Sequence, residues 1–391
     1  MIQEKQLRVL LITTMFPTKR TPSGGTFVTQ RVRAHREAGL EVTALALRHT
    51  PDRATAAVLS ALGKPRDNEL LGDDFDDVTY LINPVDLFRA KRGYPGARLL
   101  DRAAASVLRR IDGSAFDIVH AHGMYLVPAG AIAQRVSEAI GAPYAVTTHG
   151  GDINTVMPSR AHEYARVLDG AAAVAYVSDA LRERARALGS RSDRTFVIPN
   201  GIDPTTFQPK STAATSGGPT VAYVGNFLPV KGVDRLPETF HRIAAAVPGV
   251  SFVLAGDGPL LPDVQRQMSD LRARFLGRVE SGRVAEVMRS ADLLVLPSRS
   301  EGWPCVVLES HASGTPILGT DVGGSAQAIG DAQFTVPDGD DVAGRLAAVS
   351  VDFLLGRITP QPFQERAMEY AWANIARLER DMLQTAIQGA P

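Results

Sequence analysis

The sequence predicts an α/β protein with two doubly wound domains in series, each built on a parallel sheet. Short apolar segments rich in β-branched residues alternate with segments of helical periodicity, which is typical of parallel α/β sheets. This alternation stops near residues 201–220 and then starts again. The chain of 391 residues is also longer than one hydrophobic core usually organises.

Seven strand candidates precede the interruption. They are residues 7–14, 41–48, 78–84, 117–122, 144–150, 172–178 and 195–200. Helical patterns separate most of them, for example at residues 27–39 and 129–141. The first half therefore predicts one complete doubly wound domain.

The interruption at residues 201–220 is rich in Gly, Pro, Ser and Thr and has little periodicity, which favours a linker. Six strand candidates follow it, at residues 220–226, 250–257, 273–279, 291–298, 316–320 and 332–336. Residues 362–388 have the pattern of one or two helices. We expect a first domain at residues 1–203 and a second at residues 204–364.

Composition excludes several classes of protein. The chain has 42 basic and 42 acidic residues, so no bulk charge attracts nucleic acid. Its single cysteine, Cys305, excludes an internal disulfide and fits a reducing compartment. The first 17 residues lack the pattern of a secretory signal, and no run approaches the roughly 20 apolar residues of a membrane span. We expect a cytoplasmic protein, with the inner membrane face as a second location.

Two glutamates flank a predicted strand-to-helix junction in the segment EGWPCVVLE. Pro304 suits a helix start, so the amides of Cys305 and Val306 would form an anion site there. Glu301 would lie in the loop before this helix and Glu309 about one turn inside it. Two carboxylates beside an anion site favour a ligand that carries hydroxyls on either side of a diphosphate. A helix that has a glutamate in its first turns is the alternative.

Other strand ends carry further candidates. Lys231 comes just before a helix, where its ammonium would meet phosphate oxygens, although a solvated lysine is also common there. Gly24 and Gly25 precede a helix and form a possible anion-binding turn. His149 ends a strand, directly before two glycines and Asp152, which favours a functional histidine over a structural one.

Taken together, these segments resemble the retaining glycosyltransferases of family 4, which have the GT-B fold. The segment EGWPCVVLESHASGTPILGTDVGG is similar to the family's E-x7-E signature, and PSGGTFV, THGGD, IPNGID, VGNFLPVKG, LAGDGP and FLGRV follow in the family's order. The resemblance implies two Rossmann-like domains facing an interdomain cleft. It also implies that the terminal helix, residues 365–391, crosses back to the first domain.

The resemblance implies a nucleotide-sugar donor, bound mainly by the second domain. Glu301 would accept hydrogen bonds from the hydroxyls of the donor sugar, and Glu309 from those of the ribose. Lys231 would neutralise the diphosphate together with the amides of Cys305 and Val306.

Further roles follow from the same resemblance. The loop of Gly24 and Gly25 would also face the diphosphate, the backbone near Arg278 would meet the base, and His149 would approach the anomeric centre. The favoured reaction moves a hexose with retention from a nucleoside-diphosphate donor, with UDP-sugar first, to an unidentified acceptor hydroxyl. His122, Asp152 and Asn200 are the candidates on the acceptor side. No cofactor and no metal is expected.

The sequence departs from the family pattern at two positions. Asn226 stands where the family often has an arginine, and Gln327 replaces a usual glutamate. These departures concern the affinity or identity of the donor more than the reaction class.

Three alternatives stay open. Asp74 and Asp76 form a D-x-D pattern, which binds a metal in the other major glycosyltransferase fold, but here they lie in an acidic segment without the strand context of that motif. A GT-B-fold nucleotide-sugar epimerase would share the donor site. A two-domain sugar-binding protein without catalysis would share the architecture but would not need a diphosphate site.

Residues 86–110 carry seven Lys or Arg and two Asp. Such a segment can hold a phosphorylated or lipid-linked acceptor, or contact an anionic membrane. A solvated helix face is the simpler interpretation.

Overall fold

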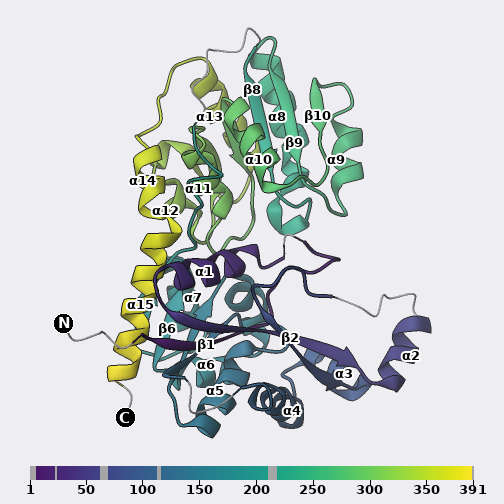
Figure 1. Ribbon diagram of the computed structural model, residues 1–391. Helices are drawn as coiled ribbons and strands as arrows, with labels where there is room; N and C mark the ends of the chain where they lie inside the picture. Colours follow the sequence, from purple (N-terminus) through teal and green to yellow (C-terminus); the bar gives the residue numbers. More distant parts are fainter. Residues whose placement is uncertain (1–5, 23, 62–68, 112–115, 210–217, 390–391) are drawn as a thin grey trace, which may run out of the picture. The chain divides into compact units, whose positions relative to one another are not determined.

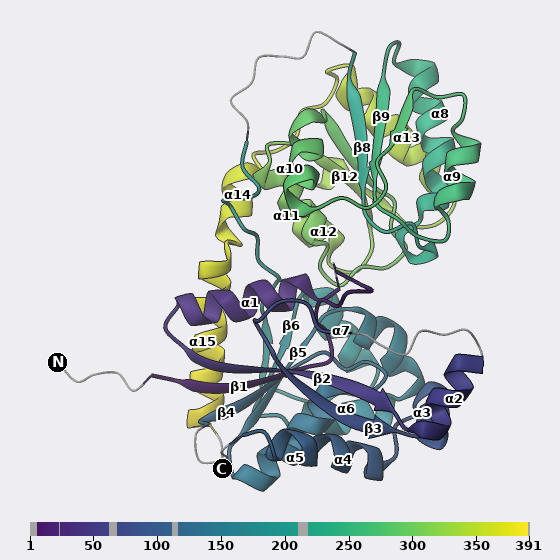
Figure 2. The ribbon, with the colours of Figure 1, turned by 45° about the vertical axis from the view of Figure 1, so that its right-hand side comes forward.

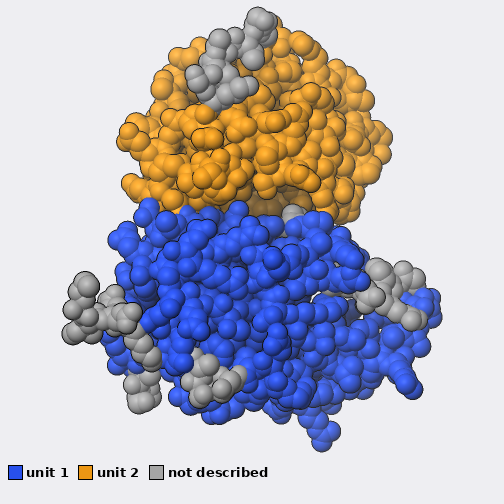
Figure 3. Space-filling model, in the orientation of Figure 1, with its two compact units in different colours: residues 1–200, 372–391 blue, residues 201–371 orange. Residues whose placement is uncertain are grey.

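The computed structural model describes residues 6–22, 24–61, 69–111, 116–209 and 218–389. The chain divides into two compact units, each of which is described by itself (Figure 3). Unit 1 contains residues 1–200 and 372–391, and unit 2 contains residues 201–371. Residues 210–217 of the expected linker lie outside the described residues.

The chain enters and leaves unit 2 at one place. Ile202 pairs with Ala371 in a parallel bridge, and the Ile202 amide donates to the Tyr370 carbonyl at 2.9 Å. These contacts draw residues 201–203 and 365–371 into unit 2, whereas the sequence analysis assigned both segments to the first domain.

Unit 1 is built on a seven-stranded parallel sheet with the strand order β3-β2-β1-β4-β5-β6-β7 (Figures 1 and 2). The strands are β1 (Arg8–Thr13), β2 (Glu41–Pro51), β3 (Asp76–Ile82), β4 (Ile118–His122), β5 (Tyr144–Thr148), β6 (Ala173–Tyr176) and β7 (Thr195–Val197). Every residue of β4, β5 and β6 is buried, because helices cover both faces of the sheet. Strand β3 lies at the edge and alternates between exposed and buried side chains.

The helices of unit 1 lie on both faces of its sheet. They are α1 (Thr26–Glu37), α2 (Arg53–Ala61), α3 (Pro84–Arg92), α4 (Ala97–Leu108), α5 (Ala129–Ile140), α6 (Ala161–Asp169), α7 (Asp179–Ala187) and α15 (Trp372–Gln388). Figures 1 and 2 show α1 on one side of the sheet and α4 and α5 on the other. Helix α15 packs against α1 as part of unit 1, as the resemblance implied.

Unit 2 has a six-stranded parallel sheet with the order β10-β9-β8-β11-β12-β13. Its strands are β8 (Thr220–Val224), β9 (Ser251–Ala255), β10 (Ala273–Phe275), β11 (Leu293–Leu296), β12 (Ile317–Asp321) and β13 (Thr335–Pro337). Its helices are α8 (Leu236–Ala246), α9 (Leu261–Gln267), α10 (Ser281–Ser290), α11 (Cys305–Ala312), α12 (Ser325–Ile329), α13 (Val342–Leu354) and α14 (Gln364–Glu369). The doubly wound order places the loops that follow the strands at one edge of the sheet.

All thirteen strand candidates overlap a strand of the structure, so this part of the sequence prediction is confirmed. The terminal stretch forms two helices, α14 and α15, separated at Tyr370 and Ala371. Within the described residues, we find no helix of the length and apolar character that crossing a bilayer requires.

Candidate functional site

Glu301 and Lys231 meet at the carboxyl end of β11 in unit 2. The Lys231 Nζ donates to both carboxylate oxygens of Glu301, at 2.7 and 2.9 Å, although the two residues are 70 positions apart. The Ser298 hydroxyl donates to the same carboxylate at 2.6 Å. The Glu301 side chain is buried, whereas 28% of the Lys231 side chain stays exposed. The ammonium can therefore reach a ligand while Glu301 holds it in place.

Two glycines fix the backbone around this pair. Gly232 has φ 62°, and a Cβ there would stand 1.9 Å from the Pro297 carbonyl oxygen at the end of β11. Gly323 has φ 58°, and its Cβ would stand 1.8 Å from the Glu301 carbonyl oxygen. A side chain at either position would push the loops apart. Gly323 is therefore required by the close approach of the Glu301 backbone.

Helix α11 begins at Cys305, directly after Pro304, and follows the loop that contains Glu301. The Val307 amide of this junction donates to the Pro304 carbonyl at 2.9 Å. The Cys305 and Val306 amides lie in the first turn, which offers no intrahelical acceptors and attracts anions. Glu301 and the start of α11 therefore lie in the loop after β11, and the Lys231 ammonium, from the segment after β8, contacts this loop through Glu301.

Glu309 lies one turn inside α11 and is half-buried. Burial raises the pKa of this carboxyl to about 7, because the charged form loses hydration. Near neutral pH the carboxyl group is therefore divided between its protonated and ionised forms. A ligand that donates hydrogen bonds would favour the ionised form.

The other two candidates of unit 2 follow strands β8 and β10, which lie on either side of β9 in the sheet. Asn226 follows β8 and is exposed, and its carbonyl accepts from the Tyr223 hydroxyl at 2.9 Å. Arg278 follows β10, is exposed, and forms no ion pair with a described residue. Sequence reasoning missed Ser298 and also Trp303, a buried side chain that packs on Tyr370 with ring centroids 5.3 Å apart.

In unit 1, Gly25 forms the N-terminal junction of α1. Its φ is 65°, and a Cβ there would stand 2.6 Å from backbone atoms of Met15 and Phe16. The Gly24 amide donates to the Thr21 carbonyl at 2.9 Å. These glycines are required by a tight turn against the loop after β1, and this turn leaves the start of α1 without a side-chain cap.

His149 directly follows β5 and is 8% exposed. Its Nε2 lies 3.2 Å from Nδ1 of His122, and its ring packs on Phe27 with centroids 4.7 Å apart. Burial lowers the pKa of His149 well below its usual value, so the imidazole is neutral. The Asp152 carboxylate accepts from the amides of His149 and Gly150 at 2.8–3.1 Å and so fixes this loop.

The three residues expected on the acceptor side do not line a surface in this structure. His122 and Asp152 are fully buried and Asn200 is 3% exposed. Asp152 accepts backbone amides, and Asn200 accepts from Arg31 at 3.0 Å. The sequence did not show that these side chains point into the protein. We therefore assign them positioning roles.

A buried polar cluster joins α15 to the sheet of unit 1. Glu379 accepts from Arg31 and lies 2.7 Å from His35 Nε2, and all three side chains are fully buried. Glu379, His120 and His122 have possible ligand atoms within 4.8 Å of one another. Both oxygens of the carboxylate already have protein partners, and the Arg31 charge disfavours a cation. The cluster therefore serves packing, and we assign no metal to it.

The D-x-D alternative also has a structural explanation. Asp74 accepts two hydrogen bonds from the Arg33 guanidinium, at 2.8 and 2.9 Å. Asp76 is the first residue of β3 and pairs with Arg110 at 3.1 Å. Contrary to expectation, the acidic segment thus leads directly into an edge strand, and Asp74 is buried.

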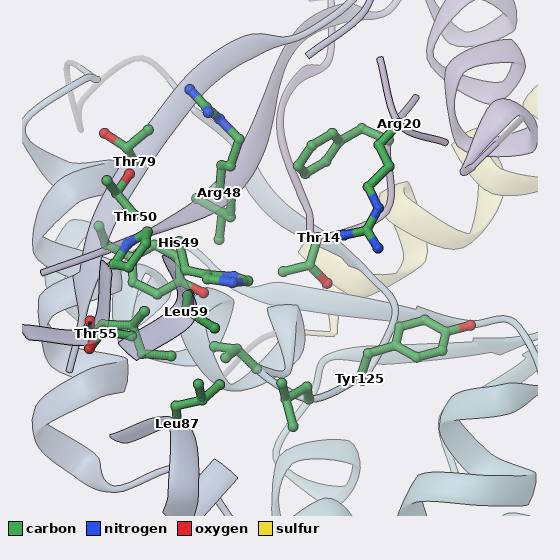
Figure 4. A pocket seen from close by; sticks show the side chains of 17 residues that line it. Thr14, Arg20, Arg48, His49, Thr50, Thr55, Leu59, Thr79, Leu87 and Tyr125 are labelled. Carbon is green, nitrogen blue, oxygen red and sulfur yellow. Dashed lines mark hydrogen bonds between the residues drawn. The ribbon is translucent and has the colours of Figure 1, made fainter. Parts of the chain in front are cut away.

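A cavity of about 670 Å³ opens at the carboxyl edge of the sheet in unit 1 (Figure 4). Its walls come from the loop after β1, the ends of β2 and β3, helices α2 and α3, and the loop after β4. Tyr125 belongs to this wall and also lies beside Gly151 of the His149 loop, where a Cβ would be 3.4 Å from its ring. Sequence reasoning missed the cavity because four separate segments form it.

Known proteins resemble both halves of the chain. Residues 24–201 match a family model described as a glycosyl transferase 4-like domain, and residues 218–352 match one described as glycosyl transferases group 1. The chain is 29% identical over 347 residues to a protein named for teichuronic acid biosynthesis, the glycosyltransferase TuaC of Bacillus subtilis, covering 84% of each chain.

Solved structures share the fold. Sucrose-phosphate synthase from Thermosynechococcus elongatus superposes with a TM-score of 0.75 at 19% identity, covering 98% of this chain and 100% of that one. HepE from Anabaena, solved in complex with UDP-glucose, has a TM-score of 0.67 at 17% identity and covers 97% of this chain and 100% of its own.

Proposed function

Because this chain belongs to the GT-B glycosyltransferases of the family 4 type, we propose that it transfers a hexose, with retention, from a nucleoside-diphosphate donor to an acceptor hydroxyl. The observation that carries the donor assignment is the contact of Lys231 with Glu301 beside the start of α11. UDP-sugar is the first donor to test, since HepE was solved with UDP-glucose.

The geometry supports a division of labour within the loop after β11. A diphosphate at the start of α11 would attract the Lys231 ammonium, which is partly exposed. Glu301 would then accept hydroxyls of the donor sugar. Lys231 and the first-turn amides of α11 would stabilise the charge that develops on the leaving diphosphate. In the same-face mechanism, the leaving phosphate oxygen takes the proton of the acceptor hydroxyl.

The remaining site assignments are part of the same proposal. Glu309 would accept the ribose hydroxyls, the backbone near Arg278 would meet the base, and Asn226 would lie near the diphosphate. The roles of the Gly24–Gly25 turn and of His149 rest on the family resemblance.

A screen of nucleotide-sugars tests the function. The purified protein would be incubated with each donor, and products would be identified by mass and anomeric configuration. Release of the nucleoside diphosphate with a retained glycoside supports the proposal. A sugar epimer formed without acceptor would instead identify an epimerase, and binding without turnover would identify a sugar-binding protein.

We expect turnover to be independent of divalent cations. Lys231 and the α11 amides supply the positive charge that a metal supplies elsewhere, and Asp74 and Asp76 are engaged by arginines. Activity should therefore persist after exhaustive chelation. Loss of activity with EDTA and recovery with manganese would contradict this and would bring the aspartates back as ligands.

Replacing Lys231 by alanine should weaken the donor interaction. A charge-assisted contact with phosphate contributes roughly 1.5–3 kcal/mol, so the donor's KM should rise or kcat should fall by about tenfold or more. Lys231→Arg should recover part of the loss. Arg266→Ala, which removes an exposed cation of the same unit that pairs with Asp263, is the control. Unchanged donor kinetics in Lys231→Ala would refute the phosphate assignment.

Binding of the nucleoside diphosphate should tighten as pH rises through 7. The ribose hydroxyls favour the ionised form of Glu309, and burial sets the pKa of the free carboxyl at about 7. Affinity should therefore rise about tenfold between pH 6 and pH 8 through this group. Because the diphosphate also titrates, calorimetric profiles of wild type and Glu309→Gln are compared. Identical profiles in the two proteins would exclude the role of Glu309.

The basic segment at residues 86–110 completes the proposal on the acceptor side. Lys91, Arg92 and Arg98 form no ion pair with a described residue. Arg102, by contrast, pairs with Asp86. The unpaired cations support a contact with a lipid-linked acceptor or an anionic membrane.

A further inference from the structure

The cavity of unit 1 is lined by both polar and apolar side chains. Thr14, Arg20 and Tyr125 stand on one side in Figure 4, and Leu59 and Leu87 stand on the other, where Arg48, His49, Thr50, Thr55 and Thr79 also lie. Arg20 is exposed and forms no ion pair with any described residue, so its charge is available to an anion.

Part of the lining is apolar and comes from three segments of the chain. Leu59 comes from α2, Leu87 from α3, and Leu126 and Val127 from the loop after β4. Sugar hydroxyls need hydrogen-bonding partners, and these four side chains offer none. An alkyl chain, in contrast, gains about 0.8 kcal/mol for each CH₂ that leaves water.

The outer surface at the end of β3 and on α3 exposes several large apolar side chains. Leu81, Val85 and Phe88 are 56–57% exposed, and they are three of the seven large apolar side chains that are exposed among the described residues. They lie within eight positions at the end of β3 and on α3, whose residue Leu87 lines the cavity. The Arg92 guanidinium lies 4.8 Å from the Phe88 ring centroid. Exposed apolar groups next to cations are typical of a surface that contacts anionic lipid.

We propose that the acceptor is an amphiphile, with an anionic head at Arg20 and an apolar chain along Leu59 and Leu87. The chain continues toward Val85 and Phe88, which rest on the bilayer that supplies the acceptor. The inference depends on the proposed function for the transfer step only, because the cavity binds the amphiphile with or without a donor.

Binding of dodecyl phosphate, below its critical micelle concentration, tests the cavity. Titration calorimetry should show saturable binding, with inorganic phosphate at least a hundredfold weaker. Leu59→Gln and Leu87→Gln should each weaken dodecyl phosphate at least tenfold. Leu355→Gln, an exposed leucine of unit 2, is the control and should have no effect. Equal affinity for phosphate with and without the chain, or unchanged binding in both leucine variants, would overturn the proposal.

Arg20→Gln tests the contact with the anionic head separately from the contacts with the alkyl chain. It should weaken dodecyl phosphate at least tenfold and leave binding of the neutral dodecyl maltoside within a factor of two. If both ligands weaken equally, Arg20 does not contact the anionic head. Thermal melts of each variant confirm that the fold is retained.

Liposome sedimentation tests the outer surface. The protein should sediment with vesicles that contain phosphatidylglycerol and stay in solution with pure phosphatidylcholine. The double variant Val85→Ser, Phe88→Ser should lose at least four fifths of the bound fraction. Sedimentation that does not change in this variant would exclude the surface.

The outcomes also separate this inference from the proposed function. UDP affinity and donor turnover of the cavity variants are measured beside the lipid experiments. Failure of every nucleotide-sugar to react, with dodecyl phosphate binding intact, would refute the transferase assignment and keep the cavity. Turnover of a soluble acceptor that the leucine variants do not alter would refute the amphiphile and keep the transferase.

Discussion

Glu301→Gln should lower kcat by about a hundredfold while leaving the affinity for free nucleoside diphosphate unchanged or higher. In the proposed site the carboxylate contacts the donor sugar, where positive charge develops in the transition state, so its loss affects the rate more than binding. The structure also explains why the affinity for free nucleoside diphosphate should not fall. Lys231 donates to both oxygens of Glu301, and a neutral amide would release the ammonium toward the diphosphate.

Steady-state kinetics and calorimetry together measure this effect. Glu309→Gln is the informative partner, since it should weaken the free nucleoside diphosphate and the donor together. Glu238→Gln, an exposed carboxylate of α8 that pairs with Arg242, controls for the loss of one negative charge. If free nucleotide binds more weakly to Glu301→Gln but normally to Glu309→Gln, the donor lies in the opposite orientation.

Glu379→Ala should be the most destabilising of the substitutions considered. It leaves the Arg31 guanidinium buried without its carboxylate, and breaking a buried pair in this way costs about 3–5 kcal/mol. For a unit of this size, the midpoint of thermal unfolding should fall by about 6–20 °C. The effect should be seen in calorimetry of the full chain at pH 7.5.

Two variants define the cause of that destabilisation. Asp381→Ala removes an exposed carboxylate two positions along the same helix and should shift the midpoint very little. Glu379→Gln keeps an acceptor for Arg31, so its midpoint of thermal unfolding should lie between those of wild type and Glu379→Ala. Equal midpoints for Glu379→Ala and wild type would show that the Arg31 charge finds another partner or leaves the interior.

The same pair responds to pH. Burial alone would raise the pKa of Glu379, but Arg31 and His35 hold it well below its usual value. The carboxylate therefore stabilises the fold above the pKa of the unfolded chain, and this stabilisation is lost as pH falls below it. Burial also lowers the pKa of His120 to about 3, because the charged imidazole would lose its hydration. Protonation of His120 in acid therefore destabilises the fold.

Periodicity predicted the fold because each strand and helix carries its own pattern. Core strands such as β1 and β11 are largely apolar runs, and helices such as α5 have one buried face. The expected domain boundaries differ from the limits of the two units where tertiary contacts set those limits. The bridge of Ile202 with Ala371 takes both crossings into unit 2, and no local pattern indicates it.

The candidate site was predictable in position but not in its contacts. Glu301, Lys231 and the α11 start were found because strand ends of a doubly wound sheet carry the chemistry. Their mutual ion pair was not found, since it joins segments 70 residues apart. The burial of His122, Asp152 and Asn200 was not predicted for a related reason: a strand-end position does not fix whether a side chain faces ligand or core.

Arg31 and Glu379 lie 348 positions apart, so Arg31 is synthesised long before the carboxylate that pairs with it. At about 5–20 residues per second, the ribosome needs about 20–70 s to deliver the partner that Arg31 requires. All of unit 2 is synthesised within that interval, while the first 200 residues lack α15 and retain an unmatched charge. A fragment that ends at residue 200 would therefore represent a nascent state of unit 1. Expressing unit 1 alone would require residues 372–388 to be grafted onto it.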